Sequence, residues 1–459
     1  MKNKWTITEW VIFAAVAVLL ALLLSLTVTM IYTISRSNLP TREETFDLDR
    51  LTSEKPAVPD EYAETLLPEF IGLTANGERR GISGSVNVMA ALYRAASVVL
   101  SDVLTAENAE TPEDGETYWR SLADEPASVY IRYHSELPDC IIGLYADWTS
   151  GRDHERKTVS SYVYELFLLP YSDVGRAVTA AVRSIDGTVT VYRLPSPDTP
   201  LSENDLFSLI LSYRSSLSAF TFAGDRYSAA SPTEPVMLDT LFARNMLITD
   251  GTSFLIRGNR DEQERLGRIF GLNMDKLLSS HDETGGVISY TDAQGGLYLL
   301  SSSFEYTAAV GEGLDPEKLL GYTGASGLDR MIRASLKIFT EIRAIGKNYT
   351  GGDAGICFDS IVSDGSTVTL TYRYTSDNIG ITGLAPAYTV TFRDGVLVRA
   401  ELNTVSAKRL AGRSELLHEW WFFEVLGGQN RLPLNVGLAY RCDFQAESIG
   451  AEWTAVFES

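Results

Sequence analysis

The sequence predicts an α+β protein with a single N-terminal transmembrane helix and an extracytoplasmic body of antiparallel sheets, each covered by helices. An uncharged apolar run near the start of the chain indicates the transmembrane helix. The rest of the chain alternates segments of helical apolar spacing with runs in which every second residue is apolar. Asp-Gly dipeptides between such runs indicate hairpins, and hairpins favour antiparallel sheets.

The apolar run extends from Val11 to Ile34, which makes 24 residues without a charged side chain. As a helix it would be about 36 Å long, enough to cross the hydrocarbon core of a bilayer. A cleaved signal peptide is the alternative, but its apolar region is only about 7–15 residues long. It also ends in a small-x-small cleavage site, which residues 25–29 match poorly. We therefore expect a retained transmembrane helix at residues 10–34, in contact with membrane lipid.

The flanks of this helix bear on its orientation. Two lysines precede it and two arginines follow it closely, so the positive-inside rule gives only a weak preference. We expect a short cytoplasmic tail, residues 1–9, and a large body outside the cell membrane. Residues 35–68 are polar and contain several prolines, which predicts a stalk between the membrane and the body.

The composition allows two or three folded domains, because the 459 residues are 45% hydrophobic and 10% aromatic. We expect an N-terminal α+β domain at residues 69–235, a middle α+β domain at 236–345 and a C-terminal α+β domain at 346–459. The formal net charge of −21 repels phosphate backbones. No nucleic-acid partner is therefore expected.

The N-terminal domain begins with a predicted helix at 83–104, where apolar residues recur every three or four positions. Strands are predicted at 128–133, 140–145, 163–169 and 188–194. A helix at 202–213 follows, and Ser202 with Asp205 approximates a capping box at its start. The proline-rich segment 231–235 indicates the end of this domain.

The second half twice shows a helix followed by several strands. Helices are expected at 260–270, 328–345 and 414–426, with a shorter helical stretch that begins at Asp315 and Pro316. Strands are expected at 286–290, 296–302, 303–310, 355–362, 367–374, 387–393, 396–404, 433–443 and 452–457. This order is compatible with repeated C-terminal subdomains, although residue identity does not show a repeat.

Motifs for catalysis or metal binding are weak. His418 and Glu419 begin a metalloprotease motif, but Phe422 occupies the position of its second histidine. Residues 81–85, Gly-Ile-Ser-Gly-Ser, have the wrong register for a nucleophile elbow. We therefore predict no catalytic, cofactor-binding or metal-ligating residue, and a protein that is not an enzyme.

Paired carboxylates leave one enzymatic alternative open, because some of the 60 acidic residues will meet in any fold. A surface-anchored, carboxylate-dependent cell-wall hydrolase would need two of them at a fixed separation. The Gly-Gly-Asp segment 351–353 and Asp359 are interpreted as a loop and a strand residue rather than as such a pair. The glycosylation pattern at residues 348–350 is short and matches often by chance.

The three cysteines, Cys140, Cys357 and Cys442, are far apart in the sequence and form no metal or redox motif. Three buried thiols are favoured over a disulfide between Cys357 and Cys442. The aromatic segment 418–423, His-Glu-Trp-Trp-Phe-Phe, places apolar groups on most of a helix surface. Packing in the core is favoured for it over a face presented to a partner.

The end of the chain resembles the closing strands of the YycH/YycI family. The residues that carry the resemblance are Leu432–Tyr440 and Ala451–Phe457. In that family an xxLGY strand is followed, after a loop, by a P-x-W strand. Gly437 is offset here from Tyr440, and Ala451 stands where the family often has proline. The layout of span, stalk and large body is also similar, so residues 346–459 are expected to form a YycI-like domain.

The resemblance implies a function as well as a fold. Members of the family are membrane-anchored accessory regulators of the WalK (YycG) sensor histidine kinase of Gram-positive bacteria, with a role in cell-wall homeostasis. It implies such a kinase as partner here, together with a paralogous single-span regulator. Small residues of the span could pack on a partner helix, although a purely lipid-facing anchor is equally compatible: Ala14, Ala15, Ala17, Ala21 and Ser25. A ligand-binding or assembly module of the envelope is a further alternative.

Overall fold

The computed structural model describes residues 62–456, apart from 63, 106–108, 153, 155–160, 172–176, 196–200, 225, 228–229, 240–241, 251–259, 274–277, 283–286, 322–326, 348–349, 417 and 428–434. The predicted tail, the predicted transmembrane helix and most of the predicted stalk lie outside these residues. So do two positions of the glycosylation pattern, Asn348 and Tyr349. The α+β class is confirmed, because the described residues form eight α-helices and three sheets.

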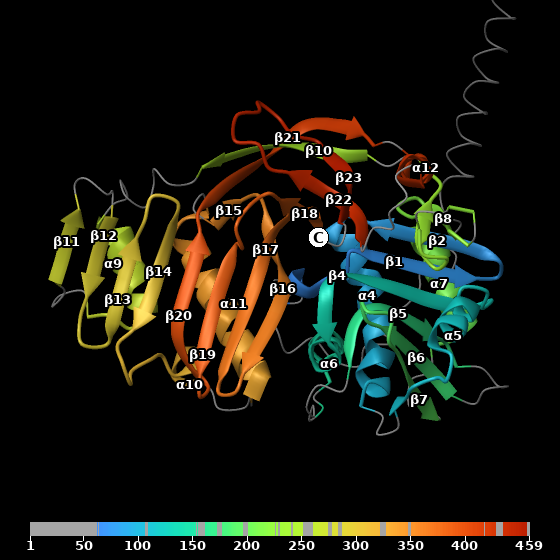
Figure 1. Cartoon of the computed structure of the whole chain (residues 1–459), viewed down its shortest axis with the longest axis horizontal. Coiled ribbons are helices and arrows are strands. Elements are labelled where there is room, and N and C mark those ends of the chain that lie inside the picture. The colour runs from blue at the N-terminus through green and yellow to red at the C-terminus, as the bar shows by residue number, and fades with distance from the viewer. Residues whose placement is uncertain are drawn as a thin grey trace, which may run out of the picture. The chain divides into compact units, whose positions relative to one another are not determined.

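The first sheet has nine strands, each antiparallel to its neighbours, in the order β3-β7-β6-β5-β4-β1-β2-β8-β9 (Figure 1). The strands are β1 (Phe70–Ala75), β2 (Glu78–Ser83), β3 (Ala109–Glu110), β4 (Ser128–Pro138), β5 (Tyr162–Leu169), β6 (Ala177–Arg183), β7 (Val189–Pro195), β8 (Ser218–Phe222) and β9 (Pro235–Met237). Asn76 and Gly77 close the β1–β2 hairpin with φ angles of 50° and 73°, as a type I′ turn requires.

Four helices accompany this sheet: α4 (Val86–Val103), α5 (Gly115–Leu122), α6 (Asp139–Ser150) and α7 (Glu203–Tyr213). Trp119 of α5 is fully buried in an aromatic cluster with Tyr130 of β4 and Phe167 of β5, to which β8 adds Phe220 and Phe222 from alternate positions. The predicted capping box is confirmed, since Ser202 Oγ accepts from the Asp205 N–H at 3.2 Å and Asp205 Oδ2 accepts from the Ser202 N–H at 3.0 Å.

The predicted strand at 140–145 is wrong, because these residues belong to helix α6. Residues 140–145 of α6, Cys-Ile-Ile-Gly-Leu-Tyr, are apolar without interruption and therefore show no helical period within this six-residue window. Residues at both ends of the helix nevertheless mark where it begins and ends. Asp139 Oδ1 accepts from the Cys140 N–H at 2.7 Å, and Gly151 ends the helix at φ 72°.

Helix α4 confirms the prediction at 83–104. Among the described residues it is the one helix that is long and apolar enough to cross a bilayer, and 61% of that apolar window is buried inside the protein. It packs against α6 and contacts β1, β6 and β7. Its apolar surface is therefore covered by protein, as in a core helix.

The second sheet has eleven strands in the order β11-β12-β13-β14-β20-β19-β17-β18-β22-β23, with β16 paired to β17 beside this path. The strands are β11 (Leu278–Asp282), β12 (Val287–Thr291), β13 (Gly295–Leu299), β14 (Ser303–Ala308), β16 (Gly355–Asp364), β17 (Thr367–Ser376), β18 (Ile379–Thr382), β19 (Tyr388–Arg393), β20 (Val396–Asn403), β22 (Asn435–Arg441) and β23 (Ala451–Val456). Antiparallel pairing of β14 with β20 joins strands of the predicted middle and C-terminal domains in one sheet. The domain boundaries themselves stay predictions.

Three helices lie with this sheet: α9 (Arg260–Ile269), α10 (Pro316–Leu320) and α11 (Gly327–Ile345). The α11 helix contacts α9, α10 and β19, and it buries Ile332, Leu336 and Phe339. The predicted cap of α10 is confirmed, since Asp315 Oδ1 accepts from the Glu317 N–H at 2.9 Å.

A third, three-stranded sheet consists of β10 (Phe242–Asp250), β21 (Val405–Glu415) and β15 (Thr350–Gly352), with β15 parallel to β21 (Figure 1). Strand β21 was not predicted, and the helix expected at 414–426 begins later, as α12 (Glu419–Gly427). The polar sequence of β21 hid it, because several of its residues are exposed and only Val405 and Ala407 are buried.

Candidate functional site

Two adjoining cavities lie in the described structure. The first has a volume of about 530 Å³ and the second about 830 Å³, sizes typical of small-molecule sites. The first described segment, the start of α4, the turn after β17 and strand β21 contribute to both, whereas residues next to β15 line the first cavity alone. Glu64, Val86, Asp377 and Arg409 line both cavities, so the two are neighbours along one cleft.

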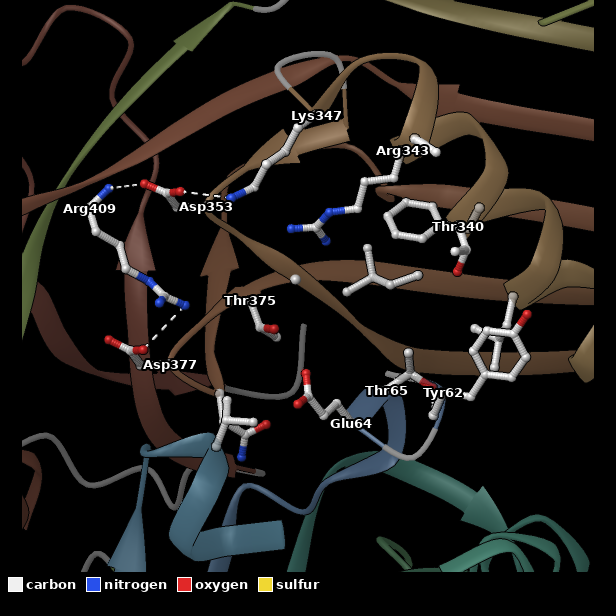
Figure 2. A pocket seen from close by; sticks show the side chains of 17 residues that line it. Tyr62, Glu64, Thr65, Thr340, Arg343, Lys347, Asp353, Thr375, Asp377 and Arg409 are labelled. Carbon is white, nitrogen blue, oxygen red and sulfur yellow. Dashed lines mark hydrogen bonds and ion pairs between the residues drawn. The ribbon is translucent and has the colours of Figure 1, made fainter. Parts of the chain in front are cut away.

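Helix α11 provides one wall of the first cavity (Figure 2). Leu336, Phe339, Thr340 and Arg343 recur at helical spacing and therefore lie along one face. The Arg343 side chain extends from the helix into the cavity, and its guanidinium donates to the Gly352 carbonyl at 3.2 Å. The wall is thus apolar along the helix and cationic at the helix end.

Charged side chains of the first cavity are held in a chain of ion pairs (Figure 2). Lys347 Nζ lies 3.1 Å from Asp353 Oδ1, and the Arg409 N–H donates to Asp353 Oδ2 at 3.1 Å. That backbone hydrogen bond is the main cause of the lowered pKa of Asp353, with Lys347 adding to it. The Arg409 guanidinium lies 3.2 Å from Asp377 Oδ1, between the two cavities. Sequence reasoning had placed Asp353 in a plain loop and missed this cleft.

Glycines position Asp353. Gly351 and Gly352 have φ angles of 90° and 62°, which other residues adopt rarely. A Cβ at Gly352 would overlap the Ala407 backbone, which runs parallel in β21. The two glycines therefore allow β15 to approach β21 closely and to end with Asp353 in the cleft.

A second polar cluster is buried beside the nine-stranded sheet. Arg132 on β4, Glu165 on β5 and Arg183 on β6 are direct cross-strand neighbours and form a row of alternating charge. Arg132 Nε lies 3.5 Å from Glu69 Oε2, and its guanidinium also pairs with Glu234. Arg132 and Glu165 are 3% and 4% exposed. The sequence analysis predicted a strand at 128–133 but made no prediction for this polar cluster.

Carboxylates outnumber guanidiniums in this buried cluster, because Glu419 at the start of α12 joins it. Burial raises the pKa of Glu419 to about 8, and Glu419 Oε2 accepts from the Met237 N–H at 2.6 Å. Burial likewise raises the pKa of Glu234 to about 7 and raises that of Glu69. Several of these groups therefore bind protons near neutral pH.

The cluster also connects the first and second sheets. Glu69, just before β1, lies against Gly437 of β22, where a Cβ would overlap Glu69 Oε1. The Asn378 amide donates to the Pro68 carbonyl at 2.5 Å and contacts His134 at 3.3 Å. Burial lowers the pKa of His134 to about 3, so it is neutral at this contact.

One Ser-His-Asp group occurs away from the cleft. Ser101 Oγ lies 3.1 Å from His154 Nδ1, which lies 2.7 Å from Asp147 Oδ1. In a catalytic triad the serine and the carboxylate contact opposite ring nitrogens. Here both contact Nδ1, and Ser101 is fully buried and donates to Asp147 itself. The geometry is that of a structural hydrogen-bond group.

The structure also shows the surroundings of the cysteines and of Asp359, which the sequence analysis had considered. In the described part of the chain, no group of three or more His, Cys, Asp or Glu side chains could hold a metal ion. All three cysteines are free thiols, but only Cys357 is buried, so the expectation of three buried thiols is wrong for Cys140 and Cys442. Asp359 pairs with Arg373 across β16 and β17.

The aromatic segment of α12 is part core and part surface. Phe423 and Leu426 are buried against Tyr227 and Val236, which confirms core packing for this side. The prediction fails for the opposite side, because Trp421 is 51% exposed.

Comparisons with known proteins give little. No model of a protein family matches the chain, and no curated protein matches it. One solved structure is similar in part, the crystal structure of an uncharacterized protein from Eubacterium rectale. It is 10% identical over 51% of this chain and 82% of that chain, with a TM-score of 0.31. A likeness at this level carries no argument about function.

Proposed function

We propose that the chain is a membrane-anchored, non-enzymatic protein of the cell envelope that binds a ligand in its cleft and regulates a partner. The observation that carries the proposal is the pair of adjoining cavities. Their charged side chains are already paired with one another, as Lys347 is with Asp353 and Arg409 with Asp377. Such pairs can be exchanged for ligand contacts, which suits recognition.

The proposed partner is a sensor histidine kinase, as the resemblance to the YycH/YycI family implies. Two features support this role. The uncharged run at 11–34 is suited to pack on the membrane helix of a partner. The two closing segments of the resemblance pair as β22 and β23, and Gly437 is the position that accepts Glu69. The body would lie outside the cell, with residues 1–9 inside.

Co-purification after crosslinking in intact cells tests the partner. The full chain should recover a sensor histidine kinase in mild detergent, and a variant with Ala17→Ile and Ala21→Ile should recover less of it, because larger side chains keep helices apart. Leu20→Ile with Leu24→Ile has the same spacing and serves as control. If the full chain is purified and no kinase is crosslinked to it, the proposed partner is wrong. Release of wall fragments by the purified chain would instead favour the hydrolase alternative.

Protease treatment of intact protoplasts tests the topology. The body should be degraded while the short N-terminal tail is protected. A fully protected body would contradict the proposed orientation, and full-length release into the medium would contradict the anchor.

A further inference from the structure

Three arginines line the second cavity: Arg244, Arg409 and Arg413. Arg244 of β10 lies directly opposite Arg413 of β21 in the antiparallel register. Arg409 belongs to the same strand and pairs with Asp377 at 3.2 Å. Glu64 is the other acidic residue of the lining, so this cavity of a chain with net charge −21 carries more cations than anions.

The opposed pair Arg244 and Arg413 is unfavourable by itself, because like charges directly opposite each other on neighbouring strands repel. Within the described part of the chain, neither side chain has an ion pair or a side-chain hydrogen bond. The sequence contains 60 acidic residues that could have supplied a partner. Both side chains are exposed where they line the cavity, so their guanidinium groups are accessible to an anion from solution.

The start of α4 adds hydrogen-bond donors to the same cavity. Val86 and Asn87, the first residues of this 18-residue helix, line it. The N-cap residue Ser85 has φ 63° and makes no side-chain cap, so it does not occupy these backbone N–H groups. Hydroxyls of Ser83, Ser215 and Ser216 complete the polar lining.

We propose that the second cavity binds a phosphate-bearing ligand between the three arginines and the start of α4. The inference deepens the proposed function and rests on it, since it names the ligand class of that cleft. Guanidinium groups bind phosphate oxygens through two parallel hydrogen bonds, and helix N-terminal N–H groups favour the same charge. The cavity of about 830 Å³ has room for more than one phosphate group.

The size of the cationic group favours a small ligand over a nucleic acid. Arg244 and Arg413 leave a small local excess of positive charge that suits one or two phosphate groups, whereas the rest of the acidic chain repels a long polyanion. The phosphate group could belong to a free molecule or to a lipid headgroup. Both sources present the same oxygens to the arginines.

Calorimetric titration of the full chain in detergent tests the proposal with two probes, inorganic pyrophosphate and short-chain phosphatidic acid. At least one should bind, more weakly as salt concentration rises. Binding of pyrophosphate identifies a free molecule as source, and binding of phosphatidic acid alone identifies a headgroup. If neither probe binds, the inference is wrong. The co-purification experiment with the kinase tests the proposed partner independently of this result.

Variants locate the site. The double change Arg244→Gln and Arg413→Gln should weaken binding roughly thirtyfold or more, while Arg393→Gln, an exposed arginine of β19 outside the cavity, should leave it within about twofold. Equal affinity of the double variant and the parent overturns the inference.

Thermal unfolding without ligand separates loss of contacts from loss of fold. Removing the repulsion between Arg244 and Arg413 should leave the Tm of the double variant equal to or above that of the parent. If the double variant does not fold, Arg413→Lys is the alternative. It keeps the positive charge but loses the planar guanidinium that makes two parallel hydrogen bonds, so it should weaken binding. Unchanged binding by the lysine variant would then count against the site.

Discussion

At the residue scale, the structure depends most on carboxylates whose protonation is set by burial. Glu419, Glu234 and Glu69 surround Arg132 with more acidic groups than it can neutralise. A buried charge without a counter-charge is costly, so the protonated form of Glu419 is favoured. The protonation of these carboxylates therefore makes the stability of the fold depend on pH.

Glu419 makes the stability of the fold pH-dependent in a stated direction. Its pKa is about 8 in the folded chain and near 4.5 when unfolded, so the folded state binds the extra proton. The stabilisation is full below about pH 4.5 and is lost as pH rises through about 8. Glu419→Gln keeps the acceptor for the Met237 N–H and should abolish this loss, which amounts to a few kcal/mol.

Urea unfolding at pH 5, 6.5 and 8 measures this effect as the difference between parent and Glu419→Gln. Glu424→Gln, on the exposed side of the same helix, is the control and should follow the parent at each pH. A parent and a Glu419→Gln variant with parallel pH profiles would show that Glu419 does not titrate in this window.

At the element scale, β22 approaches the start of β1 through one position without a side chain. Gly437→Ala should destabilise the fold by about 2 kcal/mol, because its Cβ would overlap Glu69 in a well-packed region. Gly380→Ala on the neighbouring β18 has open space and should cost less than about 1 kcal/mol. Free energies of unfolding from urea titration provide the comparison, and similar values for both variants would refute the close approach.

Elements with a clear period or a capping residue could be predicted from the sequence, and the others could not. Helices α4 and α11 and the hairpin of β19 with β20 carry such signals. The 140–145 segment of α6 is an uninterrupted apolar run, and solvated β21 has few apolar residues, so neither shows a period. The β1–β2 hairpin was readable from Asn76-Gly77 but was overlooked.

The candidate site was less accessible to sequence reasoning than the elements that form it. The cleft unites the segment at Tyr62, the start of α4, the end of α11 and strand β21, which are far apart in the chain. The opposition of Arg244 and Arg413 depends on a register that only the paired strands define. No local pattern contains that information.

At the scale of the whole molecule, the second sheet contains strands from both sides of the predicted domain boundary at residues 345 and 346. Strand β20 lies between β14 and β19, and α11, which ends at Ile345, covers β19. Residues 346–459 alone would expose both the edge of β20 and the apolar face under α11. Expressed separately, this fragment should lack cooperative thermal unfolding by circular dichroism, whereas the full chain should show it. A cooperative transition in the fragment would establish an independent domain.

The first described residues of the body are tied to the cleft and to helix α6. Tyr62, Glu64 and Thr65 line the first cavity, and Thr65 and the Tyr62 carbonyl are fastened to the Tyr145 hydroxyl of α6. Tyr62, the first described residue, is therefore part of the wall of the cleft. A ligand in this cavity would contact Glu64 and Thr65 directly, so the affinity for the ligand and the position of this first segment would be linked.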